Sequence, residues 1–254
     1  MGAGCQAPQA AVKPVCLITG AAGKLGSVLC RAFLDTHEVT AIYRNELPKI
    51  PSQVSVPIDL IRSGKGQQQA NLAFCVQGDL TVREDIRRIV EVVLARFGRI
   101  DVIIHSAADI RYHGKLLELY FDSSSVEKQL AMNCVAPMNL ISAIFQESWK
   151  NERTANRDFN RCVINVSSIS GLYVLPNVGQ AFYSASKAAL NFLTMHLAYE
   201  LADYSVRVNA ICPSRFPDSI PVAKVVAKIK QLVKSEITGQ IVEVSADERE
   251  ASKP

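Results

Sequence analysis

Two side chains capable of proton transfer stand four residues apart in the stretch AFYSASKAAL, from Ala181 to Leu190. On a helix, Tyr183 and Lys187 share one face, because four residues is close to one turn. A free phenol has a pKa of about 10 and exchanges protons poorly at neutral pH. A neighbouring ammonium favours the phenolate and lowers that pKa, which suits the pair to general acid–base catalysis. The alternative is that both residues are exposed on a helix surface and have no catalytic role.

The elements that would carry this pair follow from the alternation of apolar runs with segments of helical periodicity. Strands are predicted at 15–20, 39–44, 72–80, 100–108, 162–168, 206–213 and 239–245. Helices are predicted at 27–36, 82–98, 124–150, 183–204 and 221–235. Strands rich in Val and Ile, apolar on both faces and separated by helices, indicate a parallel sheet covered on both sides. We therefore expect an α/β fold with a Rossmann-type, doubly wound, seven-stranded parallel sheet, whose ligands bind beyond the carboxyl ends of the strands.

Length and composition favour one globular domain. The chain has 254 residues, of which 48% are hydrophobic, so a full core can form without disulfides. We expect a single domain at 13–245 between flexible tails at 1–12 and 246–254. The segment 45–71 is rich in turn-forming residues and is interpreted as an exposed excursion between the second and third strands.

Charge and cysteine usage exclude several classes of partner. The net charge of +4 is spread along the chain, so nucleic-acid binding is not expected, and the lysines within 221–235 are interpreted as a solvated helix face. Seven cysteines occur without a CxxC pair, which predicts buried thiols in a reducing compartment and no metal site. No apolar run is long enough to span a membrane and no signal peptide is recognised, so a cytoplasmic location is expected.

A glycine-rich turn, LITGAAGKLG, connects the first strand to the first helix. Gly20, Gly23 and Gly26 allow the backbone to turn tightly and approach a pyrophosphate, while the helix N-terminus offers free N–H groups to that anion. The strand–turn–helix context favours a dinucleotide site over an ordinary tight turn.

The end of the second strand indicates which dinucleotide would bind. NAD sites usually carry an acid there, to hold the ribose 2′-hydroxyl. This strand ends instead in Arg44, whose planar fork suits a phosphate, and Lys24 in the glycine turn is expected to add a second cation. Glu46 lies slightly further on and weakens this preference without reversing it. The sequence therefore predicts NADP(H) rather than NAD(H).

Further motifs stand in a fixed order along the same elements. They are TGAAGKLG, GDL (78–80), HSAA (105–108), MNCVAP (132–137), NVSSISG (165–171), YSASK (183–187), VRVNAICP (206–213) and TGQIVEV (238–244). Together they make the chain resemble the short-chain dehydrogenase/reductase family over about residues 13–245.

This resemblance implies a role for each matching residue. Tyr183 would donate a proton to a carbonyl oxygen, or remove one in the reverse reaction, and Lys187 would lower its pKa and hold the nicotinamide ribose. Ser168 would stabilise the substrate oxygen; Gly171 three residues later selects it over Ser167, with Ser170 as the fallback. Asn133 would hold a water in a proton relay through Lys187. The implied cofactor-binding residues are Gly20, Gly23, Lys24, Leu25, Gly26, Arg44, Asp79, Leu80, Ser106, Ala107, Ala108, Tyr183, Lys187 and Pro213.

The sequence also departs from the family pattern. Lys24 replaces the middle glycine of the turn, which resembles an epimerase-like branch of the family. His105 stands where an asparagine usually braces the sheet, and a structural role for it is favoured over a catalytic one. The segment 214–221 leads directly into a helix, so the usual helical lid over the substrate is expected to be missing.

Two functions from different classes remain open. The first is an NADP(H)-dependent enzyme that interconverts a carbonyl and an alcohol on a small or carrier-bound substrate, working as a homo-oligomer. The second is a non-catalytic regulatory or scaffold protein that binds the dinucleotide on the same fold. The combination of Asn133, Ser168, Tyr183 and Lys187 favours the enzyme, whereas the missing lid favours the binding protein. A nucleotide-sugar epimerase is less favoured, because the chain lacks the C-terminal substrate domain usual in that branch.

Overall fold

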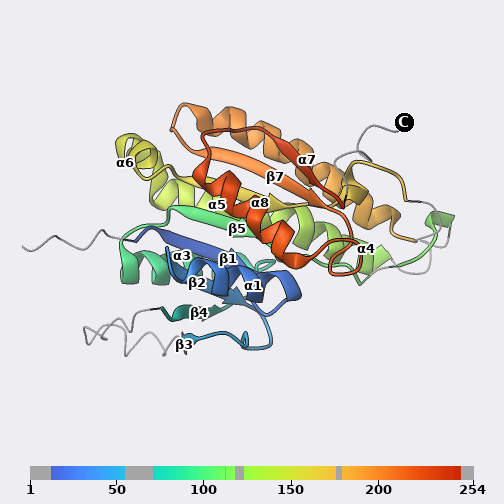
Figure 1. The fold of residues 1–254 in the computed structure, drawn as a ribbon, viewed down its shortest axis with the longest axis horizontal. Coiled ribbons are helices and arrows are strands. Elements are labelled where there is room, and N and C mark those ends of the chain that lie inside the picture. Colours follow the sequence, from blue (N-terminus) through green and yellow to red (C-terminus); the bar gives the residue numbers. More distant parts are fainter. Residues whose placement is uncertain (1–12, 55–70, 112, 118–122, 176–178, 247–254) are drawn as a thin grey trace, which may run out of the picture.

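The computed structural model describes residues 13–54, 71–111, 113–117, 123–175 and 179–246. Their core is one parallel sheet in the order β3-β4-β2-β1-β5-β6-β7-β8 (Figure 1). The strands are β1 (Val15–Thr19), β2 (Glu38–Tyr43), β3 (Ser52–Val54), β4 (Ala73–Gln77), β5 (Val102–His105), β6 (Cys162–Val166), β7 (Arg207–Pro213) and β8 (Ile241–Val244).

Helices cover both faces of this sheet. They are α1 (Lys24–Phe33), α3 (Arg83–Phe97), α4 (Ser123–Leu130), α5 (Ala136–Glu147), α6 (Arg153–Asp158), α7 (Ala181–Ala202) and α8 (Val222–Lys234). Shorter turns of helix are η2 (Ala131–Val135, a π-helix), η3 (Trp149–Asn151) and η4 (Ile169–Gly171). One apolar core joins α1 and α8 to the sheet, and a second joins α3, α5 and α7 to the opposite face.

The local sequence explains these two layers. In β1, β6 and β7 every residue is buried, as expected of strands with helices on both sides. Helix α3 has Glu84 and Asp85 in its first turn and ends at Gly98, whose φ of 72° suits glycine. Successive side chains along each strand therefore pack alternately into one core and the other.

The predicted doubly wound parallel sheet is confirmed. The structure adds the three-residue edge strand β3, which falls inside the predicted excursion at 45–71; residues 55–70 lie outside the described ranges. The long helix predicted at 124–150 is divided into α4, η2 and α5, and α6 is an element that the sequence did not reveal. The predicted tails at 1–12 and 246–254 lie outside the described residues, except for Ala246.

In the ranges that the structure describes, no helix combines the length and the apolar character needed to cross a lipid bilayer.

The amino-terminal edge of the sheet is held by a buried carboxylate just before β5. Asp101 is fully buried and accepts hydrogen bonds from the Val15 N–H at 2.8 Å and from Arg99 Nε at 2.7 Å. It also accepts a 3.1 Å hydrogen bond from Arg161 Nε, and this second arginine donates to Glu152 at 2.7 Å. Three separate strands are thereby tied together at the edge opposite the carboxyl ends.

Replacing this carboxylate should destabilise the fold strongly. Asp101→Asn leaves the buried Arg161 guanidinium without its charged partner on the sheet, so we expect the free energy of unfolding to fall by about 3 kcal/mol in urea denaturation. The control is Asp158→Asn, which breaks the exposed pair with Arg157 and should leave stability unchanged. Equal effects of the two substitutions would contradict a structural role for the Asp101 cluster.

Candidate active site

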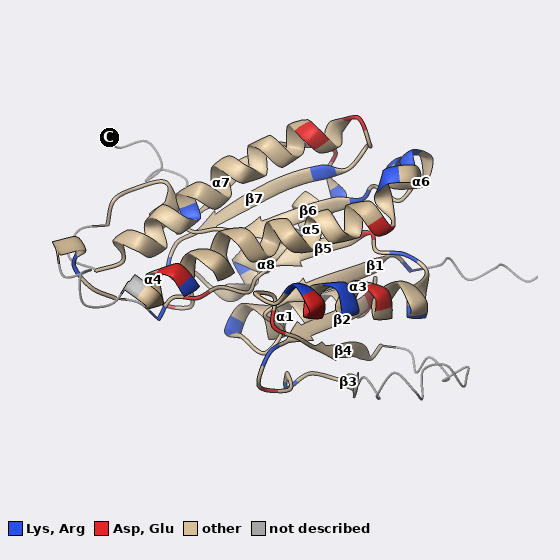
Figure 2. Ribbon diagram, turned by 180° about the vertical axis from the view of Figure 1, so that it is seen from behind, with Lys and Arg blue, Asp and Glu red and all other residues tan. Residues whose placement is uncertain are grey.

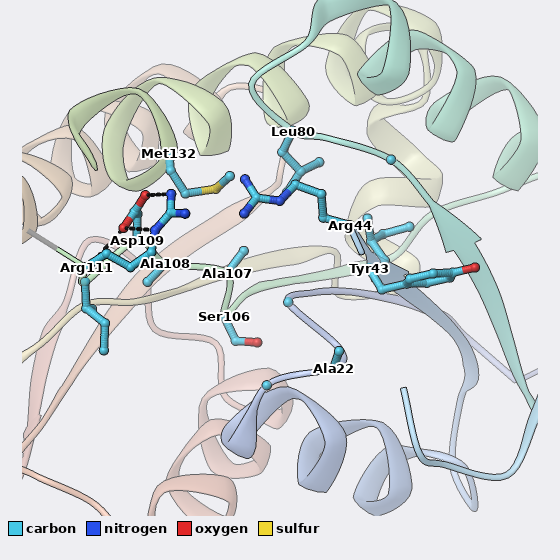
Figure 3. A pocket seen from close by; sticks show the side chains of 15 residues that line it. Ala22, Tyr43, Arg44, Leu80, Ser106, Ala107, Ala108, Asp109, Arg111 and Met132 are labelled. Atoms are coloured by element: carbon cyan, nitrogen blue, oxygen red, sulfur yellow. Dashed lines mark hydrogen bonds and ion pairs between the residues drawn. The ribbon is translucent and has the colours of Figure 1, made fainter. Parts of the chain in front are cut away.

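Two adjoining cavities lie at the carboxyl ends of the central strands. The first, of about 550 Å³, is lined by Ser168, Tyr183, Lys187 and Pro213 together with the glycine turn. The second, of about 350 Å³, is lined by Arg44, Leu80 and the segment 106–111 (Figure 3). Gly20, Gly23, Ser106 and Ala108 line both, so the cavities form one cleft across the place where strand order reverses at β1.

Tyr183 and Ser168 meet in the first cavity. Ser168 lies two residues beyond the end of β6 and is the N-cap of η4. Its Oγ accepts a hydrogen bond from the Ser170 N–H. A hydrogen bond from Ser168 lowers the pKa of Tyr183, but burial outweighs it and raises the pKa overall. The phenol is therefore protonated at neutral pH, the form required to donate a proton.

The close contact between η4 and α7 depends on Gly171. A Cβ placed there would lie 2.8 Å from the Lys187 carbonyl carbon and 2.9 Å from the Ala188 nitrogen, too near for any larger residue. Ser167, buried beside it, donates to the Lys187 carbonyl at 3.1 Å. Both serines line the cavity, but the Ser167 hydroxyl is bonded to the α7 backbone, whereas the Ser168 hydroxyl contacts Ser170 and Tyr183.

The side chain of Lys187, a residue of α7, is buried against the sheet, and its Nζ donates a hydrogen bond to the Val166 carbonyl at 2.8 Å. The Nζ lies 5.7 Å from the centre of the Tyr183 ring. Burial lowers the pKa of Lys187 to about 8. The expected lowering of the Tyr183 pKa by this ammonium is not found in the structure, because burial of the phenol dominates and the Lys187 ammonium bonds to the end of β6 instead.

Asn133 lies in the π-helical turn η2 between α4 and α5. Its Oδ1 accepts from the Asp109 N–H at 2.7 Å, and its Nδ2 donates to the Asp109 carbonyl at 2.9 Å and to Ser186 Oγ at 3.0 Å. The amide thus clamps the loop after β5 to α7. π-Helical turns within α-helices often mark functional sites.

The glycine turn has the shape that the sequence predicted. Gly20 has a φ of +67°, and a Cβ there would lie 2.7 Å from the Ala107 Cα. Gly26 packs so closely that a Cβ would lie 2.1 Å from the Gly20 carbonyl oxygen. Helix α1 has no side-chain cap and no acid in its first turn, so its free N–H groups can receive an anion. These features fit a dinucleotide pyrophosphate.

The two cations expected at the ribose phosphate lie in different parts of the cleft. Arg44 follows β2 and extends over the second cavity, with its Nη1 3.7 Å from Asp79 (Figure 3). Lys24 is the first residue of α1 and lines the cavity that holds Tyr183 instead. The structure therefore brings Arg44 and Asp79 together but does not bring Lys24 beside Arg44.

The remaining predicted residues also line this cleft. Ser106, Ala107, Ala108 and Leu80 border the second cavity, and Leu25 and Pro213 border the first. Ser106 Oγ donates to the Thr19 carbonyl at 2.5 Å, which joins the ends of β5 and β1. His105 is buried, and its Nε2 has no hydrogen-bond partner in the described part of the chain.

Sequence analysis missed two charged residues that line the second cavity. Asp109 and Arg111 form a bidentate pair at the wall of the second cavity (Figure 3), with Nε–Oδ1 and Nη2–Oδ2 distances of 3.1 and 2.5 Å. The hydrogen bond from Arg111 lowers the pKa of Asp109. Their position directly after HSAA, beyond the end of a parallel strand, could have identified them as candidates for the ligand cleft.

Over the ranges described, no group of three or more His, Cys, Asp or Glu side chains is arranged to bind a metal ion.

Comparison with known proteins gives the family. The family model described as short chain dehydrogenase matches residues 14–224. The chain belongs to this family of oxidoreductases, whose members act on CH–OH and carbonyl groups.

Similar proteins and structures agree with this assignment. An uncharacterised oxidoreductase of Thermotoga maritima is 33% identical over 199 residues, which cover 78% of this chain and 70% of the relative. The 3-oxoacyl-[acyl-carrier-protein] reductase FabG of the same organism is 28% identical over 199 residues, 78% of this chain and 72% of the relative.

Among solved structures, a 4-hydroxyisoleucine dehydrogenase complexed with NADH and succinate has a TM-score of 0.69 and 25% identity, covering 90% of this chain and 96% of that one. An actinorhodin polyketide ketoreductase with NADPH has a TM-score of 0.74 and 20% identity, covering 92% and 96%, and so supports the fold.

The buried Lys187 predicts an unusual dependence of stability on pH. Its pKa of about 8 in the folded state lies below the ordinary value of about 10.5, so between these values the unfolded chain binds more protons than the folded one. Stability contributed by this residue therefore rises as the pH increases from about 8 to 10.5. Lys187→Met should raise the free energy of unfolding by roughly 1–2 kcal/mol at pH 7 and by much less at pH 10.

Urea denaturation of both proteins at the two pH values measures this difference. Lys234→Met, which removes an exposed ammonium at the end of α8, serves as the control and should have little effect at either pH. A loss of stability at pH 7 in Lys187→Met would contradict the energetic cost inferred for the buried ammonium.

Proposed function

We propose that this protein is an NADP(H)-dependent oxidoreductase that interconverts a carbonyl and an alcohol, with Tyr183 as the proton donor or acceptor. The observation that carries the proposal is the convergence of Ser168, Tyr183 and Lys187 on one cavity beside the glycine turn. A nicotinamide dinucleotide, when bound in the cleft, would supply or accept the hydride.

The residues of the chain would do the remaining work. In the reductive direction, the Tyr183 hydroxyl donates its proton to the carbonyl oxygen of the substrate. The Ser168 hydroxyl donates a hydrogen bond to that oxygen as negative charge develops there. Lys187 keeps N–H donors beyond the one that bonds Val166, and these can hold the nicotinamide ribose. Asn133 supports the relay by fixing the loop at Asp109.

A preference for NADP(H) is supported by Arg44. Its guanidinium stands at the carboxyl end of β2, where an acid would favour NAD(H), and its side chain is partly exposed to an incoming phosphate. Asp79 competes for this guanidinium, although a separation of 3.7 Å makes their pairing weak. Lys24 is more suited to the pyrophosphate, since it begins α1 beside the first cavity.

A carrier-bound or otherwise bulky carbonyl substrate is supported by the short connection at 214–221. No helix intervenes between β7 and α8 there, and Arg215 and Phe216 line the cavity directly. One relative is named as a reductase of 3-oxoacyl groups on acyl carrier protein. The alternative function, a regulatory protein that binds the dinucleotide without turnover, gains support from the same missing lid but leaves Ser168 and Tyr183 unexplained.

We also propose a homo-oligomer in the cytoplasm. Helix α7 carries only Lys187 and Glu200 as charged residues (Figure 2), and its outer face exposes Phe192, Met195 and Tyr199, large apolar side chains suited to burial against a second copy. The six cysteines within the described residues are free and buried, as a reducing compartment favours.

Tyr183→Phe should retain dinucleotide binding and lose nearly all turnover. The substitution removes one oxygen and little volume, so the fold is preserved while no proton donor remains at the substrate oxygen. Oxidation of NADPH against a panel of ketones, quinones and carrier-bound 3-oxoacyl thioesters measures turnover, and nucleotide fluorescence measures binding. Tyr204→Phe is the matched control, because it removes the same oxygen beyond the end of α7 from a ring that packs on Phe145 outside the cleft, and it should keep turnover. Full activity of Tyr183→Phe on a substrate turned over by the parent would refute the proposed role.

NADPH should bind more tightly than NADH, and Arg44→Ala should abolish the difference. A charge-assisted contact with a phosphate is worth about tenfold to a hundredfold in affinity, and only NADPH offers that contact. Fluorescence titration with both nucleotides gives the ratio of dissociation constants. Lys24→Ala should weaken both nucleotides by the same factor, because Lys24 lines the other cavity. Equal affinities of the parent protein for both nucleotides would exclude the NADP(H) preference.

A further inference from the structure

A row of buried polar side chains crosses the sheet beneath α7. Thr19, His105 and Asn165 are register partners at the ends of β1, β5 and β6, so their side chains point to the same face. They are 0%, 2% and 0% exposed. The face is the one covered by α7, since Asn165 Nδ2 donates to Thr194 Oγ1 at 2.9 Å.

Two atoms of this row lack partners. Thr19 Oγ1 accepts a hydrogen bond from the Ala107 N–H, but neither His105 Nε2 nor Asn165 Oδ1 has a partner among the described residues. A buried polar atom left without a hydrogen bond costs about 1–3 kcal/mol. Asn165 Oδ1 can only accept, and the two unpartnered atoms are not bonded to each other, so a water that donates to Asn165 could satisfy both.

The side chain next to this row is the buried ammonium of Lys187. It is anchored to the carbonyl of Val166, the residue that follows Asn165. No carboxylate pairs with Lys187 in the described part of the chain. A buried charge without a counter-charge must be stabilised by dipoles or by water.

We propose that His105 Nε2 and Asn165 Oδ1 together hold one buried water, and that this water stabilises the charged Lys187 side chain from the sheet side. His105 and Asn165 are then positioning residues, distinct from Asn133, which acts from η2. The inference deepens the proposed function, since it concerns how Lys187 stays charged where it would hold the nicotinamide ribose. A polar site with two protein contacts and an adjacent ammonium gives a buried water the partners it needs.

The groups that face Lys187 allow this arrangement. They are Tyr183 on α7 itself, Cys134 on η2, Cys212 on β7 and His105 on β5. Burial raises the pKa of both thiols, and burial together with the Lys187 charge lowers the pKa of His105 to about 3. These neighbours are neutral at pH 7, so Lys187 carries the only charge within this set. A neutral imidazole can bond a water through Nε2 without repelling the ammonium.

A crystal structure of the parent protein at high resolution tests the water directly. We expect an ordered water within hydrogen-bond distance of both His105 Nε2 and Asn165 Oδ1. A direct bond between these two side chains, or an empty space between them, would overturn the inference. This measurement requires neither substrate nor cofactor and therefore stands even if the proposed enzymatic function fails.

The effect on Lys187 is tested by His105→Leu and its polar counterpart His105→Asn. The leucine removes one anchor of the water, so the ammonium should lose its proton at a lower pH. We expect the loss of NADPH binding at alkaline pH to shift downward by about one pH unit, and His105→Asn to restore much of the parent profile. Nucleotide fluorescence titrations across pH measure both profiles.

The matched control is Thr40→Val on β2. Thr40 is buried and its Oγ1 is also unpartnered among the described residues, but it lies two strands away from β5. Thr40→Val should leave the pH profile of NADPH binding unchanged. An unchanged profile in His105→Leu, or an equal shift in Thr40→Val, would show that the polar row does not act on Lys187.

Discussion

The burial of the Lys187 ammonium, which has no carboxylate partner among the described residues, is the constraint on which the site depends. An acid beside Lys187 would occupy its N–H donors and cancel its field. The carbonyl at the end of β6 occupies one donor and leaves the charge intact. This arrangement requires close contact between α7 and the loop after β6, which Gly171 permits and Ser167 fastens. The position of Ser168 relative to Tyr183 follows from the same contact.

Polar groups are treated differently at the two ends of the parallel strands. At the amino-terminal edge, Asp101 is satisfied by a backbone N–H and two arginines, and no ligand is needed there. At the carboxyl-terminal end of the sheet, donors are left available: the N–H groups that begin α1 and the remaining N–H groups of Lys187. Stabilising interactions at one edge thereby offset unsatisfied polar groups at the other, as is common where proteins bind ligands.

Sequence reasoning succeeded where a local pattern determines the outcome. Seven strands and the glycine turn were predicted because apolar runs and glycine spacing act over a few residues. It failed where tertiary contacts decide. Asn133 in the π-helical turn bonds to Asp109 and Ser186, which lie 24 and 53 residues away in the sequence. The side of the cleft that Lys24 lines, and the burial that raises the Tyr183 pKa, are likewise set by packing that no short motif encodes.

The two sides of the cavity that holds Tyr183 are built differently: one is a short connection, and the other consists of two loops joined by hydrogen bonds. On the β7 side, the chain passes from Pro213 to α8 through 214–221 alone, with Phe216 facing the cavity. On the other side, the Gly114 N–H bonds the Gly179 carbonyl at 2.9 Å, and Gln180 contacts His113, so two loops are tied beside Tyr183. Strand β3, which falls inside the predicted excursion at 45–71, lies at the opposite end of the strand order from β7 and β8. A substrate would therefore be oriented mainly by the tied loops, while its remote part extends past 214–221. In the function proposed above, the contacts of this remote part would supply the binding energy that a closing lid would otherwise provide.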